Sequence, residues 1–457
     1  MLPTAPQYFY FVVLSFFLYW PLSGKSPKAG IALVCLANLY FLAQWGWISL
    51  SILPAASFCD FLIGRSLGSA KTHRKLLITC SVMLNTGLIV SSKYLPLLLG
   101  KAFTHWVMPL GLSFYAFQAM TYTIDLYRKE AKPAANYWVY LASVTFFPTM
   151  LAGPINQVAK LLPQWTPKAT VTGEEGSRAF FLIGLGLAKK FLIADYLAKT
   201  LVNRVFDLPT LYSGGDVLVA VYAYAFQLYY DFSGYTDIAL GTGLLLGIKL
   251  AINFNGPYQA ENIANFWRRW HISLSNWLTN YLFHSLPGKR VKAMLYLNLV
   301  ITMAIGGLWH GASWTFLVWG LLHGLGLAGY RGWVALRKNA KPSPLLIPKI
   351  WRILLTFHFV TFAWIFFRAA SLETALQILG QIASVKTYTF DNSSPAFLFV
   401  LGIAIIGHYV PKAWYDWSIV SFGRFPAPAQ ALAMAALVLS IRYIAATGAA
   451  PFIYTRF

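Results

Sequence analysis

The stretch from Ala293 to Tyr330 decides the fold. It reads AMLYLNLVITMAIGGLWHGASWTFLVWGLLHGLGLAGY and contains no Lys, Arg, Asp or Glu. It is long enough for two membrane crossings of about 20 residues each. Near its middle, His310 follows Gly306-Gly307-Leu308-Trp309 and precedes Gly311. An ionisable side chain inside an apolar span is costly and marks a candidate functional site. The alternative is a buried histidine that is hydrogen-bonded to a nearby carbonyl.

The composition indicates a membrane protein. Hydrophobic residues make up 58% of the 457 residues and charged residues only 11%, whereas soluble domains carry about 25% charged residues. The apolar runs are continuous, unlike the alternating segments of about ten residues in membrane barrels. The sequence therefore predicts an all-α polytopic integral membrane protein. The net charge of +22 lies mostly between the apolar runs. The positive-inside rule and anionic lipids account for it there, and nucleic acid is not indicated as a partner.

Basic loops alternate with the apolar runs. The loops at 25–28, 65–75 and 128–132 are separated by pairs of runs, so we expect them on one side of the membrane. The positive-inside rule makes that side cytoplasmic and places the N-terminus outside. With neither an internal repeat nor a soluble domain evident, we expect one integral membrane domain, 1–457, with about ten to twelve segments, some partial or re-entrant. The main apolar runs are 8–20, 29–59 (broken near Gly46), 76–92, 102–124, 136–151, 179–194, 217–230, 293–330, 351–367, 395–410 and 427–446.

A second unusual stretch, 262–281, combines aromatic and basic residues. At 100° per residue it predicts one amphipathic helix. The helix would either lie at the membrane interface or present its polar side to a cavity within the bundle. Asp231 and Asp237 interrupt the apolar region before it, and we expect Arg268, Arg269 or other bases to pair with them. The predicted aromatic stripe consists of Phe266, Trp270, Leu274, Trp277 and Tyr281.

Four motifs in order along the chain carry a family resemblance. They are Asp231-Phe-Ser-Gly-Tyr-Thr-Asp237, Asn253-Phe-Asn-Gly-Pro-Tyr258, Phe266-Trp-Arg-Arg-Trp-His-Ile-Ser-Leu-Ser275 and Gly307-Leu-Trp-His-Gly-Ala-Ser-Trp314. Together they resemble the membrane-bound O-acyltransferase superfamily, most closely the bacterial branch that acylates extracytoplasmic polysaccharides such as alginate. The resemblance implies a helical bundle around a central channel, with the catalytic core at about 105–330. One departure is Gly256, where the family often has histidine.

The resemblance also implies roles for individual residues. His310 matches the family's essential histidine, and His271 its second polar position. Histidine titrates near neutrality and therefore suits a general base. His323 follows His310 by 13 residues, so on one continuous helix it would face about 220° away unless the helix breaks at Gly311. The residues expected to bind substrate or line the channel are Asn253, Asn255, Arg268, Arg269, Trp309 and Trp314.

The expected activity is acyl transfer across the inner (cytoplasmic) membrane of a bacterium. A cytoplasmic thioester, acetyl-CoA or another, would supply an acetyl group for hydroxyls of a polysaccharide, directly or through a periplasmic acyl-accepting partner protein. Cys35, Cys59 and Cys80 form neither CxxC spacing nor a Cys/His cluster, so neither a metal site nor a disulfide framework is expected. No bound cofactor is expected either, since the thioester is a substrate. The alternatives are D-alanyl transfer to teichoic acid, an acyl channel without catalysis, and a scaffold for polysaccharide modification. A channel would predict inverted repeats.

Overall fold

Helices form all the regular structure in the part of the chain that the computed structural model describes, namely residues 5–69, 72–94, 111–165, 170–288, 291–337, 348–384, 388–444 and 452–453. The predicted all-α class is therefore confirmed. The chain divides into two compact units. Unit 1 contains Met1–Leu187, Gly234–Ile252 and Trp417–Arg456, and unit 2 contains Ala188–Ser233 and Asn253–Asp416.

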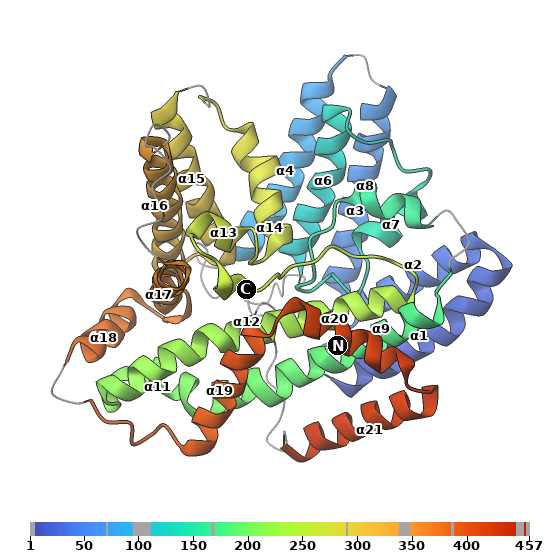
Figure 1. Ribbon diagram of the computed structural model, residues 1–457. Helices are drawn as coiled ribbons and strands as arrows, with labels where there is room; N and C mark the ends of the chain where they lie inside the picture. Colours follow the sequence, from blue (N-terminus) through green and yellow to red (C-terminus); the bar gives the residue numbers. More distant parts are fainter. Residues whose placement is uncertain are drawn as a thin grey trace. The chain divides into compact units, whose positions relative to one another are not determined.

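Unit 1 is built on three helices that run side by side, α3, α4 and α6 (Figure 1). A polar cluster joins them, because the hydroxyl of Ser81 donates to Asp60 at 2.6 Å and the amide of Asn85 donates to the other carboxylate oxygen at 2.9 Å. The helices of unit 1 are α1 (Pro6–Lys25), α2 (Pro27–Ala43), α3 (Trp47–Ser69), α4 (Arg74–Lys93), α6 (Leu112–Arg128), α7 (Tyr137–Val144), α8 (Val158–Leu161), η2 (Leu162–Trp165), α9 (Gly173–Ala188) and α21 (Ala427–Ile444).

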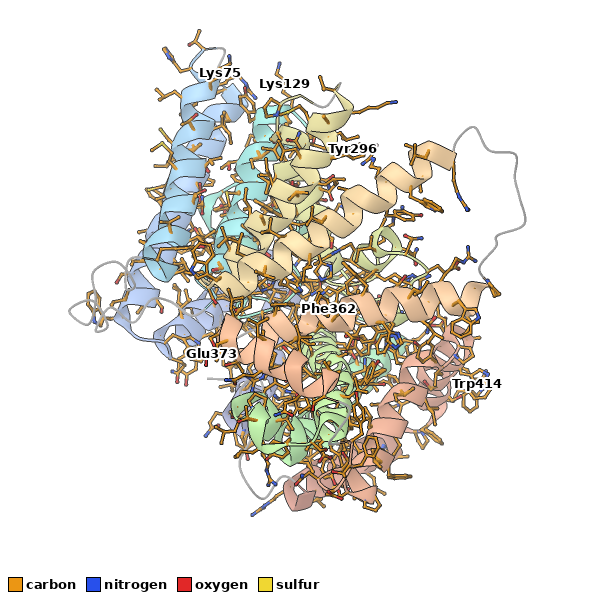
Figure 2. All side chains as sticks on the ribbon, turned by 90° about the vertical axis from the view of Figure 1, so that its left-hand side faces the viewer. Lys75, Lys129, Tyr296, Phe362, Glu373 and Trp414 are labelled. Carbon is orange, nitrogen blue, oxygen red and sulfur yellow. The ribbon has the colours of Figure 1, made fainter. Side chains whose placement is uncertain are left out.

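One end of unit 1 is basic. Lys75 and Lys129 lie together at this end (Figure 2). The guanidinium of Arg74 donates to the carbonyls of Leu126 and Tyr127 at 2.9 and 2.8 Å, and also to the carbonyl of Leu67. These bonds supply donors to carbonyls in the last turns of α6 and α3, where the helix itself offers few. The structure thus places residues 72–75 and 128–132 at one end of unit 1. That the basic loops all lie on one side of the membrane stays a prediction.

Unit 2 holds three of the four motifs that carry the family resemblance, and Asp231–Ser233 of the remaining one. Its longest helix, α12 (Gly214–Leu245), continues into unit 1 after Ser233, and α20 (Lys412–Arg424) also has residues in both units. The other helices of unit 2 are η3 (Lys189–Ala194), α10 (Asp195–Leu197), η4 (Ala198–Val202), α11 (Asn203–Asp207), η5 (Pro209–Leu211), η6 (Pro257–Gln259), α13 (Ile263–Trp267), α14 (Ile272–Trp277), η7 (Leu278–Leu282), η8 (Phe283–Ser285), α15 (Lys292–His310), α16 (Trp314–Arg337), α17 (Lys349–Arg368), α18 (Leu372–Ala383) and α19 (Pro395–Tyr409).

Glycines allow α15 and α16 to pack closely as an antiparallel pair. A Cβ atom at Gly307 would lie 2.2 Å from the carbonyl oxygen of Phe316, and one at Gly320 would lie 2.4 Å from that of Met303. Both contacts are far too short for a side chain, so only glycine fits at these positions. The close approach fixes the carboxyl end of α15, which carries His310, against the start of α16.

The candidate membrane spans overlap four of the predicted apolar runs, 29–59, 76–92, 293–330 and 351–367, and the bent pair begins in a fifth, 395–410. Within the described ranges, α3, α4, α15 and α17 are long and apolar enough to cross a membrane, and α19 with α20 would add a fifth span as a bent pair. The predicted break near Gly46 is confirmed, because α2 ends at Ala43 and α3 begins at Trp47. The run 102–124 is described only from residue 111 onward, where it forms α6. The total of ten to twelve segments stays a prediction.

Candidate active site

His310 is the last residue of α15 and is only 2% exposed. Aromatic rings surround it: the ring centroids of Trp309, Trp319 and Phe367 lie 4.8, 5.2 and 5.0 Å from that of the imidazole. Phe316 lies within 6.0 Å. We refer to His310 and these four residues as the His310 ring cluster. It places an ionisable group among apolar rings, where water is largely excluded.

The helix breaks directly after His310. Residue 311 is extended, and α16 begins three residues later at Trp314. Ser313 stabilises the new helix, because its hydroxyl accepts from the backbone N–H of Thr315 at 3.2 Å. A Cβ atom at Gly311 would lie 2.6 Å from the ring of Phe316, so a side chain there would displace a member of the ring cluster. On a continuous helix His323 would face away from His310. The break at Gly311 is the one case in which the sequence analysis allows the two side chains to approach each other.

His323 is fully buried beside the His310 ring cluster. Its ring lies 5.0 Å from that of Trp319, which also contacts His310. The indole of Trp267 donates to Nδ1 of His323 at 3.3 Å. Since an indole nitrogen can only donate, Nδ1 of His323 is the acceptor and the proton of the neutral ring is on Nε2. Trp319 therefore lies between the imidazoles of His310 and His323. The sequence allows the two histidines to lie this near only if the helix is broken.

The predicted single amphipathic helix over 262–281 is wrong. The segment forms α13, a turn, α14 and the π-helical η7. His271 is in the left-handed region at φ 40°, which few residues other than glycine adopt. The reason is a paired backbone segment: the N–H of Ile272 donates to the carbonyl of Asn253, and the N–H of Asn255 donates to that of Arg269, both at 3.0 Å. The residues of the expected aromatic stripe are all buried, so the stripe packs in the core of unit 2.

Asn253 holds the side chain of His271. Oδ1 of Asn253 accepts from the backbone N–H of Ser273 at 3.3 Å and from its hydroxyl at 2.6 Å. These two donors identify that atom as the oxygen of the amide, so Nδ1 of His271, 3.3 Å away, must donate to it. Nε2 is then the basic nitrogen of the neutral ring. His271 lies outside the candidate spans, and burial lowers the pKa of its imidazole to about 3. The ring is therefore neutral near pH 7.

The other predicted site residues lie in different environments. Arg269 donates from Nε to Asn265 at 2.8 Å and from a terminal nitrogen to the carbonyl of Asn255 at 3.1 Å. Its guanidinium thus braces the paired backbone. The side chains of Arg268 and Asn255 are exposed, and Trp314 is 72% exposed at the start of α16. The structure therefore groups Asn253 with His271 and Trp309 with His310, and leaves Arg268, Asn255 and Trp314 at the surface of the described residues.

A series of ring contacts leads from Trp270, the chain neighbour of His271, to His310. Trp270, the neighbour of His271, lies 5.0 Å from Trp364, which stacks on Trp319 at 5.7 Å and 17°. Trp319 in turn contacts His310. Sequence reasoning missed Trp319, Trp364, Phe367 and Ser273. Ser273 lies within a motif and Trp319 follows one closely, but Trp364 and Phe367 come from α17. No local pattern indicates that α17 packs here.

The carboxylate of Asp231 has a partner that the sequence did not single out. Nζ of Lys190 lies 2.7 Å from Asp231 and 2.8 Å from Asp195, and all three side chains are buried. Lys190 lies in the π-helical segment η3, where the helix widens and side-chain spacing changes. The expected pairing with Arg268 or Arg269 is therefore replaced by one of the other bases.

A further histidine secures the segment that holds His271. The backbone N–H of Tyr258 donates to Nε2 of His408 at 3.1 Å, and the amide of Gln259 donates to the carbonyl of His408 at 2.9 Å. The hydroxyl of Tyr409 donates to the carbonyl of Tyr258 at 3.1 Å. These bonds tie residues 258–259, which follow Asn253 and Asn255, to the end of α19.

Comparison with known proteins identifies the class. The family model described as MBOAT, membrane-bound O-acyltransferase family, matches residues 128–374. The chain is similar to the peptidoglycan O-acetyltransferase of Helicobacter pylori, at 34% identity over 81% of this chain and 77% of that protein. It is also similar to the probable alginate O-acetylase AlgI of Pseudomonas aeruginosa, at 36% identity over 87% and 78%. The teichoic acid D-alanyltransferase of Streptococcus thermophilus is 29% identical over 50% of this chain and 58% of that protein.

The chain thus belongs to the membrane-bound O-acyltransferase family. It is an acyltransferase with multiple membrane segments, as the sequence motifs predict. All eight predicted site residues lie within the matched range 128–374, and so do the missed ring residues of α17. This range contains both the His310 ring cluster and the turn of His271.

Proposed function

We propose that the protein is an O-acetyltransferase that moves an acetyl group from a cytoplasmic thioester to hydroxyls of an extracytoplasmic polysaccharide, with His310 as general base. The observation that carries the proposal is the burial of His310 among aromatic rings at the carboxyl end of α15, inside a family motif. An ionisable group at membrane depth costs free energy, and its presence there indicates a functional role.

In the proposed reaction the hydroxyl oxygen of the acceptor attacks the carbonyl carbon of the thioester. A C–O bond forms and the C–S bond breaks. His310 takes the proton of the hydroxyl as the attack proceeds and returns it to the thiolate that leaves. The thioester is a substrate here, and the protein needs no resident cofactor for these steps.

The position of His310 suits a base that is charged only briefly. The ring cluster largely excludes water, so solvent competes little with an acceptor hydroxyl for the imidazole. The carboxyl end of a helix carries a partial negative charge, which stabilises the imidazolium once it forms. α15 has 19 residues and ends at His310, so its dipole acts at this residue.

His271 is proposed as the second catalytic residue, through Nε2. Asn253 fixes the ring by accepting from Nδ1, so the basic nitrogen has a defined direction. The lowered pKa keeps that nitrogen unprotonated at neutral pH. It can therefore accept a hydrogen bond from an acceptor hydroxyl and orient it.

The choice of acetyl and of a polysaccharide rests on the relatives. Those that match most of this chain are named as O-acetylating proteins of alginate or peptidoglycan. Those named as D-alanyltransferases match about half of it. With the basic loops on the cytoplasmic side, a bacterial inner-membrane location would put the thioester and the polysaccharide on opposite sides. A periplasmic protein that accepts the acyl group is an alternative immediate acceptor.

The proposal can be tested with the purified full chain in proteoliposomes. Acetyl-CoA labelled in the acetyl group is supplied without any partner protein, and mass spectrometry follows the label. Loss of label from the thioester, with ester formation on added polysaccharide, is expected. An intact thioester under all conditions would favour the channel or scaffold alternatives. Turnover of a D-alanyl thioester, but not of the acetyl thioester, would assign teichoic acid instead.

A further inference from the structure

Unit 1 contains a cavity at its basic end that the proposed reaction does not use. The cavity has a volume of about 520 Å³, within the roughly 300–1,000 Å³ of small-molecule sites. It lies between the connection that follows α6 and the short helices α7, α8 and η2. We call it the loop cavity. It is lined by Lys129, Glu130, Ala131, Lys132, Pro133, Ala134, Ala135, Val139, Ala159, Leu162 and Pro163.

The wall of the loop cavity is held in place by its own contacts. The backbone N–H of Ala134 donates to the hydroxyl of Tyr122 at 3.1 Å. Pro133 packs on α3 so closely that a Cβ atom at Gly68 would lie 2.4 Å from its ring. The side chain of Asn136 accepts from the N–H of Val139 at 3.0 Å and starts α7. The cavity is therefore formed before any ligand binds, which reduces the entropy cost of binding.

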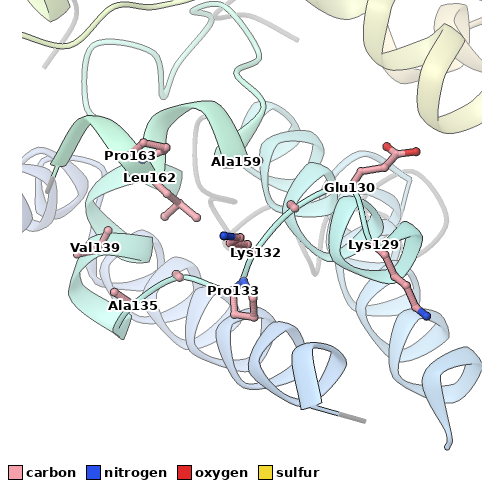
Figure 3. A pocket seen from close by; sticks show the side chains of 11 residues that line it. Lys129, Glu130, Lys132, Pro133, Ala135, Val139, Ala159, Leu162 and Pro163 are labelled. Atoms are coloured by element: carbon pink, nitrogen blue, oxygen red, sulfur yellow. The ribbon is translucent and has the colours of Figure 1, made fainter. Parts of the chain in front are cut away.

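The charged side chains of the loop cavity point in different directions. Lys132 points from the loop toward Leu162, while Lys129 and Glu130 point away from the cavity (Figure 3). One ammonium group thus faces walls that are otherwise alanine, proline, leucine and valine. Such a site suits a ligand with one negative charge and an apolar part next to it.

The surroundings favour a negative ligand. Arg128, Lys129, Lys132 and Lys160 lie on or next to the lining segments, against the single carboxylate of Glu130. Lys75 lies at the same end of unit 1 (Figure 2). In a membrane protein a basic end of this kind lies at the headgroup level of the cytoplasmic leaflet, and basic pockets there bind the headgroups of anionic lipids.

We propose that the loop cavity binds the phosphodiester headgroup of an anionic phospholipid, with Lys132 as the group that contacts the phosphate. The apolar walls at Val139, Leu162 and Pro163 would contact the glycerol and the first methylenes of the chains. Free phosphate is the other source of the same group. It has no apolar part for these walls and carries up to two charges against one facing ammonium, so the lipid is the better match.

The test compares two variants with the same change of charge in the same loop. Lys132→Glu reverses the charge that faces the cavity, and Lys129→Glu reverses one that points away from it. The purified full chain is exposed to phosphatidylglycerol or phosphatidylcholine in detergent, and native mass spectrometry counts the lipid that is retained. Wild type and Lys129→Glu should retain phosphatidylglycerol over phosphatidylcholine. Lys132→Glu should lose this retention about fivefold or more.

Two further arms keep the result interpretable. Lys132→Gln should show a smaller loss in the same direction, and it replaces Lys132→Glu if that variant fails to fold by size-exclusion chromatography. Inorganic phosphate is added as a competitor. Equal retention by the two charge-reversal variants would overturn the proposal, as would equal retention of the two lipids. Displacement of phosphatidylglycerol by inorganic phosphate at millimolar concentration would assign the site to free phosphate.

Discussion

At the residue scale, the sequence identified the histidines and Asn253, but not the hydrogen bond through which Asn253 orients His271. His310 and His271 were singled out by motif, and both are buried where a catalytic role is physically reasonable. The contact from Asn253 to His271 depends on a left-handed turn at residue 271, which helical periodicity could not indicate. Trp314 is the last residue of its motif, but its side chain is exposed, because α16 begins there and turns it outward.

The lowered pKa of His271 predicts a specific response of stability to acid. In the unfolded chain this group titrates near 6.5, and in the fold near 3. Protons therefore bind preferentially to the unfolded chain between these values, so the free energy of unfolding is unaffected above about pH 6.5 and falls as the pH falls below it. His271→Asn lacks this imidazole. When the pH is lowered from about 7.5 to 5, its free energy of unfolding should therefore fall by about 2 kcal/mol less than that of wild type. Denaturation in detergent at both pH values measures the difference. The same loss in both proteins would contradict the burial of a neutral His271.

At the scale of elements, apolar runs predicted helices well and their interruptions poorly. The break near Gly46 is confirmed, because α2 ends at Ala43 and α3 begins at Trp47. The stretch 262–281 has a helical pattern, yet hydrogen bonds to residues 253–255 divide it. Such bonds join residues that are far apart in sequence, so a local pattern cannot reveal them.

The close packing of α15 on α16 predicts different effects for two glycines of the same helix. A Cβ atom at Gly320 would meet the backbone of Met303 and Ala304, whereas one at Gly329 meets nothing within 4 Å. Gly320→Ala should destabilise the protein by about 1–3 kcal/mol through overpacking. Gly329→Ala should stabilise by up to about 1 kcal/mol, because alanine is the better helix former. Thermal unfolding in detergent compares them. Equal midpoints would show that the pair is less tightly packed.

The buried ion pairs of Lys190 predict a large drop in the free energy of unfolding when the lysine is replaced. Lys190→Met leaves the carboxylates of Asp195 and Asp231 without this partner and should cost about 3–5 kcal/mol. Lys249→Met is the control, since Lys249 pairs with Glu175 at the surface and its loss should cost less than about 1 kcal/mol. Chemical denaturation gives both values. A similar small loss in both variants would mean that the buried pairs contribute little.

At the scale of the whole molecule, composition fixed the class and charge predicted the orientation. The regular structure of the described residues is helical, and the family is a membrane acyltransferase family, as expected. The expectation of one domain over 1–457 remains a prediction, although the chain forms two compact units. Both units draw on segments far apart in sequence: α12 begins in one and ends in the other. Composition carries no information about such a division.

The orientation in the membrane can be tested at the basic end of unit 1. Lys129 lies at this end, which the positive-inside rule places in the cytoplasm. In a background without Cys35, Cys59 and Cys80, a cysteine introduced by Lys129→Cys should react with a membrane-impermeant maleimide in inverted vesicles and not in spheroplasts. Reaction in spheroplasts would reverse the orientation, and with it the proposed direction of acyl transfer.

The most direct test of the central claim is acyl transfer by His310→Ala in proteoliposomes, with His358→Ala as its control. His358 is an exposed histidine of α17 whose Nδ1 lies 2.7 Å from the carbonyl of Leu354, away from the His310 ring cluster. Removal of a general base should lower the rate of acetyl transfer by about 10²–10⁴-fold, while His358→Ala should transfer at the rate of wild type. Both variants should elute as folded protein in size-exclusion chromatography. Near-normal transfer by folded His310→Ala would contradict the assignment of His310 as the base.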